Sequence, residues 1–100
     1  MNFRSEASAT SLTAKPKPNP NVLFRRLGNA MVLFHLSSDR FYELNATGAR
    51  LWELLTAGHD VGEAHQLMLQ EFAVDPDQLA SETETLLEMM RREDLLTLNE

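Results

Sequence analysis

The stretch RFYELNATGARLWELL, from Arg40 to Leu55, joins the two halves of this chain. Its first five residues, Arg40 to Leu44, include the aromatic side chains that favour strands. Asn45 then offers a side-chain acceptor for the free amides at the start of a helix. Trp52 and Leu55 follow at a spacing of three, as on one face of a helix. The stretch therefore predicts a strand that turns into a helix within a few residues.

Two strand-like runs come before this junction. They are Val22 to Leu27 and Ala30 to Leu36, and they are separated by Gly28-Asn29, a pair that tolerates the positive φ of tight hairpin turns. A polar, turn-forming segment, Ser37 to Arg40, leads into the third strand, Phe41 to Leu44. We therefore predict a three-stranded antiparallel meander with the third strand at an edge.

Three helices are predicted after the junction. The first runs from Thr47 to Ala57 and ends near Gly58, which suits a left-handed cap. The second starts at Asp60, whose side chain can form a capping box with Glu63. The third starts at Asp75-Pro76, where proline at the first helical position loses no hydrogen bond. The expected fold class is α+β and winged helix-turn-helix-like, a three-stranded antiparallel sheet followed by a three-helix bundle.

Apolar side chains indicate which faces of these elements pack together. Core packing is the interpretation that we prefer for Leu44, Trp52, Leu55 and Leu86. A satisfied or half-exposed position in the middle strand is the preferred interpretation for His35. The residues expected to close the chain as a short extended segment over the helices are Leu95, Leu96 and Leu98.

The first twenty residues differ in character from the rest. They are rich in Ser, Thr, Ala and Lys, and they end in KPKPNP, where proline at every second position removes amide donors. We therefore expect a flexible tail over residues 1–20 and a single domain over residues 21–100. Residues 1–18 are expected to be dispensable for folding.

Composition excludes several kinds of site. One hundred residues with 43% hydrophobic content suit one small domain, and the absence of cysteine excludes disulfides and thiolate metal sites. The three histidines are too dispersed for a metal site, and no cofactor is expected. With no apolar run of membrane-spanning length and no secretory signal, a cytoplasmic protein with no membrane association is the default.

Catalytic arrangements are also missing from the pattern. We find no nucleophile beside a base, no perturbed carboxylate pair and no phosphate-binding loop, so the chain is expected not to be an enzyme. Charge divides unevenly along the chain. Residues 1–44 carry six basic and three acidic side chains, and the remainder carries three arginines and twelve carboxylates. An acidic helical half disfavours binding to nucleic acid.

A winged-helix layout has two uses with different physics. A DNA-binding domain needs basic side chains on the helix that enters the major groove. The predicted third helix instead has Glu82, Glu84 and Glu88 on its wet face. Peptide capture by strand addition needs only an open sheet edge and an adjacent helix with an apolar lip. The sequence contains the ingredients of this second use, and a winged-helix DNA-binding transcription factor is the alternative.

The run from Tyr42 to Leu55 also resembles the L-N-x-T-(A/G)-A-x-(I/L)-W-x-L-L pattern of PqqD-like proteins, also called RiPP precursor peptide recognition elements. The residues that carry the resemblance are Tyr42, Leu44, Asn45, Thr47, Gly48, Ala49, Leu51, Trp52, Leu54 and Leu55. It extends over residues 22–98 and includes the order of the elements. The resemblance implies a carrier that binds the leader of a ribosomally made precursor peptide during natural product biosynthesis. It also implies that the leader is presented to a tailoring enzyme, such as a radical-SAM protein, a leader peptidase or a cyclase.

The same resemblance places the leader between the third strand and the third helix. The implied peptide-binding residues are Arg40, Phe41, Tyr42, Glu43 and Leu44 on the strand, with Leu79, Glu82, Thr83, Leu86 and Met90 on the helix. Tyr42 shares parity with Leu44 and is expected to face the helices, whereas Phe41 and Glu43 point to the other face. The helical residues divide between core and groove in a way that the sequence leaves open.

Two further alternatives stay open at this point. A structural subunit that docks onto an enzyme has the same composition as a carrier, and neighbouring reading frames for a short precursor and a modifying enzyme would separate the two. A homodimer formed through the edge strand is the other, because an open edge can pair with a second copy.

Overall fold

A computed structural model describes residues 13–97 of the chain. Its sheet has the order β3-β4-β5, formed by the antiparallel strands Val22–Leu27, Ala30–His35 and Arg40–Leu44. Leu27 pairs with Ala30 across a two-residue loop in which Gly28 has a φ of 61°. That positive φ at the first loop position is the one that a II′ hairpin turn requires of glycine. The predicted meander and its edge strand are therefore confirmed.

Each helix begins at a side chain that caps its free amides. α1, Ala46–Thr56, starts after Asn45, which accepts a hydrogen bond from the amide of Gly48 at 3.0 Å. α2, Val61–Glu71, starts with the predicted capping box of Asp60. α3, Pro76–Arg92, follows Asp75 and has proline in its first turn. The local chemistry at Asn45, Asp60 and Asp75 thus accounts for where the three helices start.

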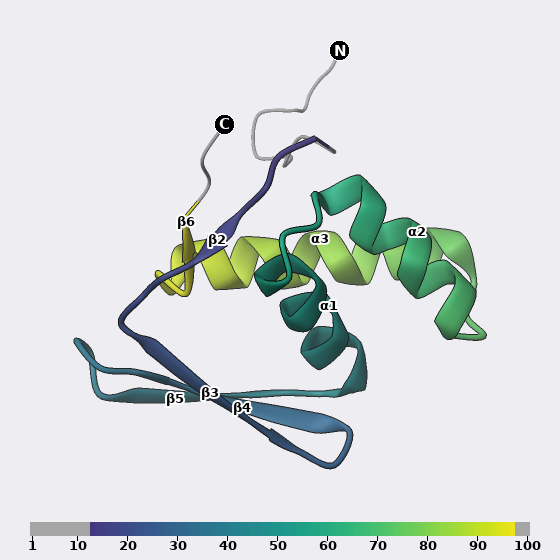
Figure 1. Cartoon of the computed structure of the whole chain (residues 1–100). Coiled ribbons are helices and arrows are strands. Elements are labelled where there is room, and N and C mark those ends of the chain that lie inside the picture. Colours follow the sequence, from purple (N-terminus) through teal and green to yellow (C-terminus); the bar gives the residue numbers. More distant parts are fainter. Residues whose placement is uncertain (1–12, 98–100) are drawn as a thin grey trace.

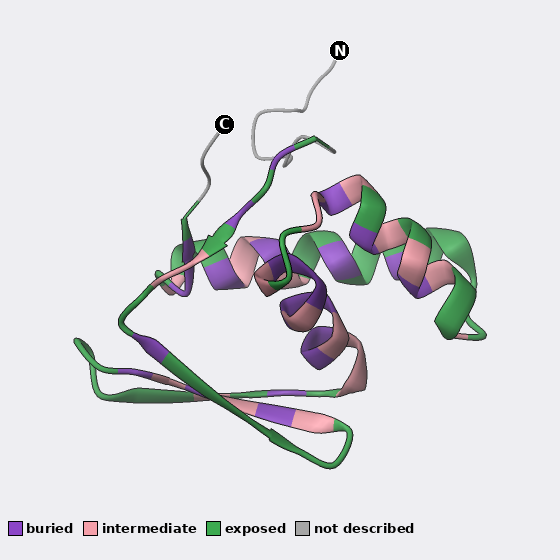
Figure 2. Cartoon of the chain, in the orientation of Figure 1, coloured by how far each residue is buried: buried purple, intermediate pink, exposed green. Residues whose placement is uncertain are grey.

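All three helices lie on one side of the sheet (Figure 1). α1 packs directly on the sheet, and α2 and α3 pack against α1. The largest side chains of this core are fully buried, and Figure 2 shows buried residues in purple along the helices and the strands. They are Trp52, Met31, Leu33, Leu44, Leu51, Leu55, Met68, Leu79, Met90 and Leu95. Trp52, Leu44 and Leu55 are therefore core residues, as predicted.

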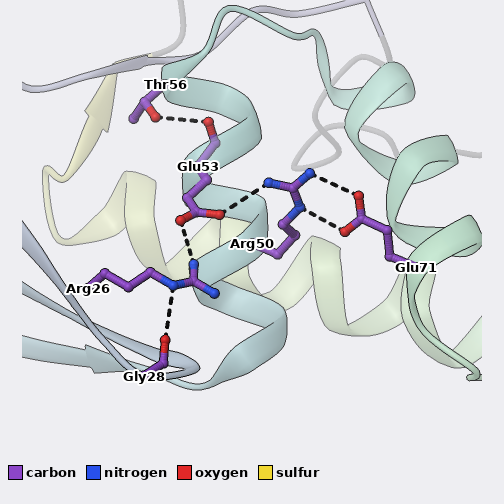
Figure 3. Close-up of polar contacts among 6 residues, drawn as sticks. All are labelled: Arg26, Gly28, Arg50, Glu53, Thr56 and Glu71. Carbon is purple, nitrogen blue, oxygen red and sulfur yellow. Dashed lines mark hydrogen bonds and ion pairs between the residues drawn. The ribbon is translucent and has the colours of Figure 1, made fainter.

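A chain of ion pairs runs from the sheet across α1 to α2 (Figure 3). Arg26 of β3 contacts Glu53, which also accepts from Arg50 at 3.2 Å. Arg50 donates two hydrogen bonds to Glu71, at 2.7 and 2.9 Å. These hydrogen bonds raise the pKa of Arg50, and the same guanidinium lowers the pKa of Glu71. The network thus links β3, α1 and α2 through side chains that are about one-third exposed.

The N-terminal segment corrects one prediction from the sequence. Residues 14–19 are packed on the domain, because β2, Lys17–Pro18, pairs with β6, Leu96–Thr97, and Ala14 is only 3% exposed. Prolines at alternate positions remove the donors on one edge only. The amide of Asn19 remains free to donate to the carbonyl of Leu95 at 2.9 Å. The expectation of a flexible tail to residue 20 is wrong for this part, and residues 1–12 lie outside the described residues.

The closing segment behaves largely as expected. Leu95 and Leu96 are 0% and 3% exposed and cover the end of α3, whereas Leu98 lies outside the described residues. Within residues 13–97, no helix is both long enough and apolar enough to cross a bilayer.

Candidate functional site

One edge of the sheet is open. Among the described residues, β5 pairs with β4 on one side and has no strand on the other. The amide of Leu36 donates to Asn21, so the even-numbered residues of this segment direct their backbone groups toward β3. The odd-numbered residues of β4, such as Leu33 and His35, therefore bond to β5.

The same alternation determines which β5 groups are free. Leu33 pairs with Tyr42, and His35 pairs with Arg40, so the backbone groups of these two β5 residues are used within the sheet. The amides and carbonyls of Phe41 and Glu43 point away from β4. These four groups form a short template for another extended chain.

Side chains along β5 alternate as predicted. Leu44 is 2% exposed and lies in the core, and Tyr42 is half-buried on the same face. Phe41, at 71% exposure, and Glu43 lie on the face away from the helices. A peptide at this edge therefore meets the helices through the Tyr42 face alone.

α3 provides the wall beside the edge, and its predicted residues separate into two groups. Leu79, Thr83 and Met90 are at most 4% exposed and turn into the core. Leu86 is half-buried and Glu82 is exposed, and both line a hollow of about 380 Å³ at the N-terminal end of α1. The other residues lining this hollow are Asn45, Thr47, Gln78, Ser81 and Thr85.

Close contact between α1 and α3 sets the floor of the hollow. A Cβ on Gly48 would lie 3.2 Å from Leu44 Cβ and 3.3 Å from Leu86 Cδ2. An alanine at position 48 would therefore require Leu44 or Leu86 to give way by a few tenths of an ångström. Gly48 permits the approach that places Leu86 beside the end of β5.

The other end of α3 reaches the start of β5 through polar contacts. The hydroxyl of Tyr42 donates to Glu93 Oε1 at 2.9 Å, and Arg40 lies 3.4 Å from the same oxygen. Burial and the neighbouring Glu93 carboxylate raise the pKa of Tyr42. A second hollow here is lined by His35, Ser37, Ser38, Arg40, Tyr42, Arg92, Glu93 and Asp94. The groove between β5 and α3 thus has a hollow at each end.

His35 has a structural position. Its side chain is 3% exposed, its Nδ1 accepts from the amide of Ser37, and its Nε2 lies 3.2 Å from the carboxylate of Asp94. The proton therefore sits on Nε2 and is donated to Asp94. Asn19 donates to the same carboxylate at 3.1 Å. His35 is a satisfied histidine of the middle strand, as expected.

Comparison with known families identifies this arrangement. Residues 30–96 match the model of the family described as Coenzyme PQQ synthesis protein D (PqqD). The chain belongs to the PqqD family. The match spans β4 to β6 and so includes both sides of the groove. The family resemblance read from the Tyr42 to Leu55 stretch is confirmed.

Two solved structures share the fold. One is described as TbiB1 in complex with the TbiA(beta) leader peptide, with 26% identity and a TM-score of 0.74, covering 80% of this chain and 93% of that chain. The other is a lasso peptide synthetase B1 complexed with the leader peptide, with 20% identity and a TM-score of 0.75, covering 84% and 99%. Comparison with curated proteins gives no match.

Several groove residues of this PqqD family member were missed from the sequence. Gln78 and Thr85 lie four and three positions from Glu82, and Ser81 lies three from Gln78 and four from Thr85, so all of them share one side of α3. That spacing is the signal that would have found them. Glu93 was missed because it ends the helix, where periodicity no longer applies.

The outer surface of α3 is acidic. Glu82 and Glu84 are exposed, and Glu88 is paired with Arg91 at 2.8 Å. A phosphate backbone gains nothing from such a surface. Within residues 13–97, no group of three or more His, Asp or Glu side chains is placed to hold a metal ion.

Proposed function

We propose that this chain is a carrier that binds the leader of a ribosomally made precursor peptide and presents it to a modifying enzyme. The observation that carries the proposal is the unpaired edge of β5, which points the backbone groups of Phe41 and Glu43 outward beside α3. The chain shares 26% identity and its fold with TbiB1, a protein solved in complex with a leader peptide. Strand addition at β5 is the binding mode that this edge supports.

Main-chain hydrogen bonds provide the part of the affinity for the leader that does not depend on the leader's side chains. Two outward amides and two outward carbonyls can pair with an extended leader, and each bond contributes about 0.5–1.5 kcal/mol net. This total is too small for specific binding alone. The remainder has to come from leader side chains inserted between β5 and α3.

Side chains on the two walls have separate roles in the proposal. Tyr42 and Leu86 present half-buried apolar surface to an inserted leader side chain, and Glu82 and Arg40 are exposed at the two ends. Leu44, Leu79, Thr83 and Met90 support these walls from the core and do not touch the leader. The peptide-binding residues proposed from the sequence thus divide into a contacting set and a supporting set.

The carrier itself catalyses nothing in this proposal. Of the three histidines, His35 is paired with Asp94, and His59 lies 3.4 Å from Glu63 at the start of α2. Both ring nitrogens of His35 are used, one by the backbone amide of Ser37 and one by Asp94, which leaves neither to accept a proton from a nearby serine hydroxyl. Chemistry on the precursor would therefore come from a separate partner, such as a radical-SAM enzyme, a leader peptidase or a cyclase.

The alternative of a DNA-binding transcription factor is disfavoured on two grounds. The family match is to PqqD, and the related structures are described as complexes with leader peptides. The acidic surface of α3 is also unsuited to the major groove. Those descriptions name a leader peptide as the bound partner, and they do not support the homodimer considered from the sequence.

Amide-resolved NMR tests the proposal directly. The labelled protein would be titrated with a synthetic leader of the precursor encoded beside its gene. We expect the largest shifts at the amides of Phe41 and Glu43 and along the Leu86 side of α3. Shifts confined to α2, with the Arg40–Leu44 amides unchanged, would rule out strand addition at β5.

A further inference from the structure

The face of the sheet opposite the helices carries an apolar patch that no other element covers within the described residues. Because side chains alternate along a strand, the residues that do not face α1 gather on this face. The apolar ones form the outer patch, which consists of Leu23, Leu27, Val32, Phe34, Leu36 and Phe41, and the charged Arg25 and Glu43 lie on the same face on either side of Val32. Leu23, Leu27, Leu36 and Phe41 are between 48% and 71% exposed. The helices all lie on the other side (Figure 2).

The outer patch is continuous across all three strands. Leu23 pairs with Phe34, and Phe34 pairs with Phe41, so one apolar row runs from β3 to the open edge. The rings of Phe34 and Phe41 lie 4.6 Å apart. Contiguous apolar surface of this kind on a small domain marks a protein interaction site.

The patch ends at the strand to which the leader would add. An added strand extends the sheet by about 4.8 Å, and its outward side chains continue the row that ends at Phe41. A partner seated on the patch therefore touches the carrier and the leader at once. A protein that acts on the leader needs such a contact, whereas a second copy of the carrier does not.

We propose that the outer patch is the docking surface for the enzyme that modifies the precursor peptide. This inference rests on the proposed function and names the surface that it uses. The partner surface is apolar at its centre and carries a carboxylate opposite Arg25. Arg25 is exposed on the same face and makes no ion pair with any residue from 13 to 97. Because an added leader strand would extend the row that ends at Phe41, the loaded carrier should bind the enzyme more tightly than the empty one.

The test uses the full chain, its synthetic leader and the purified modifying enzyme encoded beside its gene. The double variant Leu23→Thr/Leu27→Thr removes apolar surface from β3 with a strand-forming residue and leaves β5 untouched. We expect its affinity for the leader to stay within twofold of wild type and its affinity for the enzyme to fall at least tenfold. The matched control is Val74→Thr, which changes a residue that is 40% exposed in the α2–α3 loop and should leave both affinities unchanged.

A second variant keeps the test informative if the double variant Leu23→Thr/Leu27→Thr does not fold. Arg25→Glu keeps the apolar surface, reverses one exposed charge and should also weaken enzyme binding while sparing leader binding. Normal leader binding with unchanged enzyme binding in both variants would overturn the inference and leave the proposed function standing. Failure of the wild type to bind the leader would overturn both. Concentration-dependent dimerisation in sedimentation that both variants abolish would assign the patch to a second copy instead.

Discussion

Glu43 is the residue at which backbone direction and side-chain direction can be tested separately. Its amide points to the open edge and its side chain to the outer face. Proline at this position removes the outward donor without breaking a sheet bond, because edge strands tolerate proline where the missing N–H faces outward. Glu43→Pro should therefore weaken leader binding at least about tenfold, or 1.4 kcal/mol. Fluorescence anisotropy with a labelled leader measures this.

The two controls for this variant come from the same strand. Glu43→Ala keeps the amide and should leave leader binding nearly unchanged. Tyr42→Pro removes an amide that pairs with Leu33 in the sheet, so it should lower the melting temperature much more than Glu43→Pro. Equal loss of binding in Glu43→Ala and Glu43→Pro would show that the side chain, and not the backbone, holds the leader.

Trp52 tests the core at the same scale. It is 0% exposed, and Phe24 of β3 meets it edge-on at 5.7 Å between ring centroids. Trp52→Ala should lower the free energy of unfolding by about 3–5 kcal/mol, a large share of the stability of a small domain. Trp52→Phe should cost less, because it keeps a ring and removes an indole N–H that has no partner within the described residues. Urea unfolding checks both, and normal stability of Trp52→Ala would contradict the core assignment.

Among the elements, α3 has one side in the core and one at the groove. Leu86 lies on the groove side, so Leu86→Asp should weaken leader binding at least about tenfold. The matched control is Leu69→Asp on α2, another partly buried leucine that packs on the core. Both variants should lose some stability, and only Leu86→Asp should lose binding. Equal losses of binding in the two would indicate that general destabilisation is the cause. Met90 is 0% exposed, so a charge there tests folding and not the groove.

The pairing of α1 with α2 has a pH dependence. Arg50 lowers the pKa of Glu71 in the folded state. The ion pair therefore contributes its full stabilisation of the folded state above the ordinary carboxyl pKa, and this stabilisation is lost as pH falls through the lowered pKa. Both side chains are about one-third exposed, at 34% and 37%, so the contribution is at most about 1 kcal/mol.

The comparison for this pair is urea unfolding between pH 7 and pH 3. Glu71→Gln should be less stable than wild type at pH 7, and the difference should shrink as pH falls through the lowered pKa of Glu71. Glu84→Gln, which changes an exposed carboxylate on α3, should match wild type at every pH. A difference between Glu71→Gln and wild type that does not shrink as pH falls would mean that the ion pair is not its source.

For the whole molecule, the N-terminal segment contributes to stability in a way that can be measured by truncation. Two proteins would be compared, one that begins at Thr13 and one that begins at Asn21. The shorter protein loses buried Ala14 and Pro16, the β2–β6 pairing and the contacts of Asn19 with Asp94. Each kcal/mol lost from the free energy of unfolding lowers the melting temperature by roughly 4–8 °C in a domain of this size. We expect a loss of several degrees, and equal melting temperatures would show that the packing of residues 13–20 contributes nothing.

Much of this fold follows from local chemistry in the sequence. Asn45, Asp60 and Asp75 cap helices whichever way those helices later pack, because a cap satisfies amides within its own turn. Gly28 permits its hairpin for the same local reason, and alternation along a strand places Phe41 and Glu43 on one face. The element order and the edge strand were accessible from such local signals, and the family was accessible from the motif between Tyr42 and Leu55.

The tertiary structure decided which of several equivalent residues are buried and which neighbouring strand each backbone group bonds to. Leu86 and Met90 lie on one helical stripe, and the packing leaves Leu86 half-buried beside Gly48 and Leu44 while Met90 is fully buried. The amide of Glu43 points outward because the odd-numbered residues of β4 form their hydrogen bonds with β5. This direction is set by the pairing of the strands and cannot be read from the sequence of either strand. β2 is two residues long and has no periodicity, so its pairing with β6 is decided entirely by the folded chain.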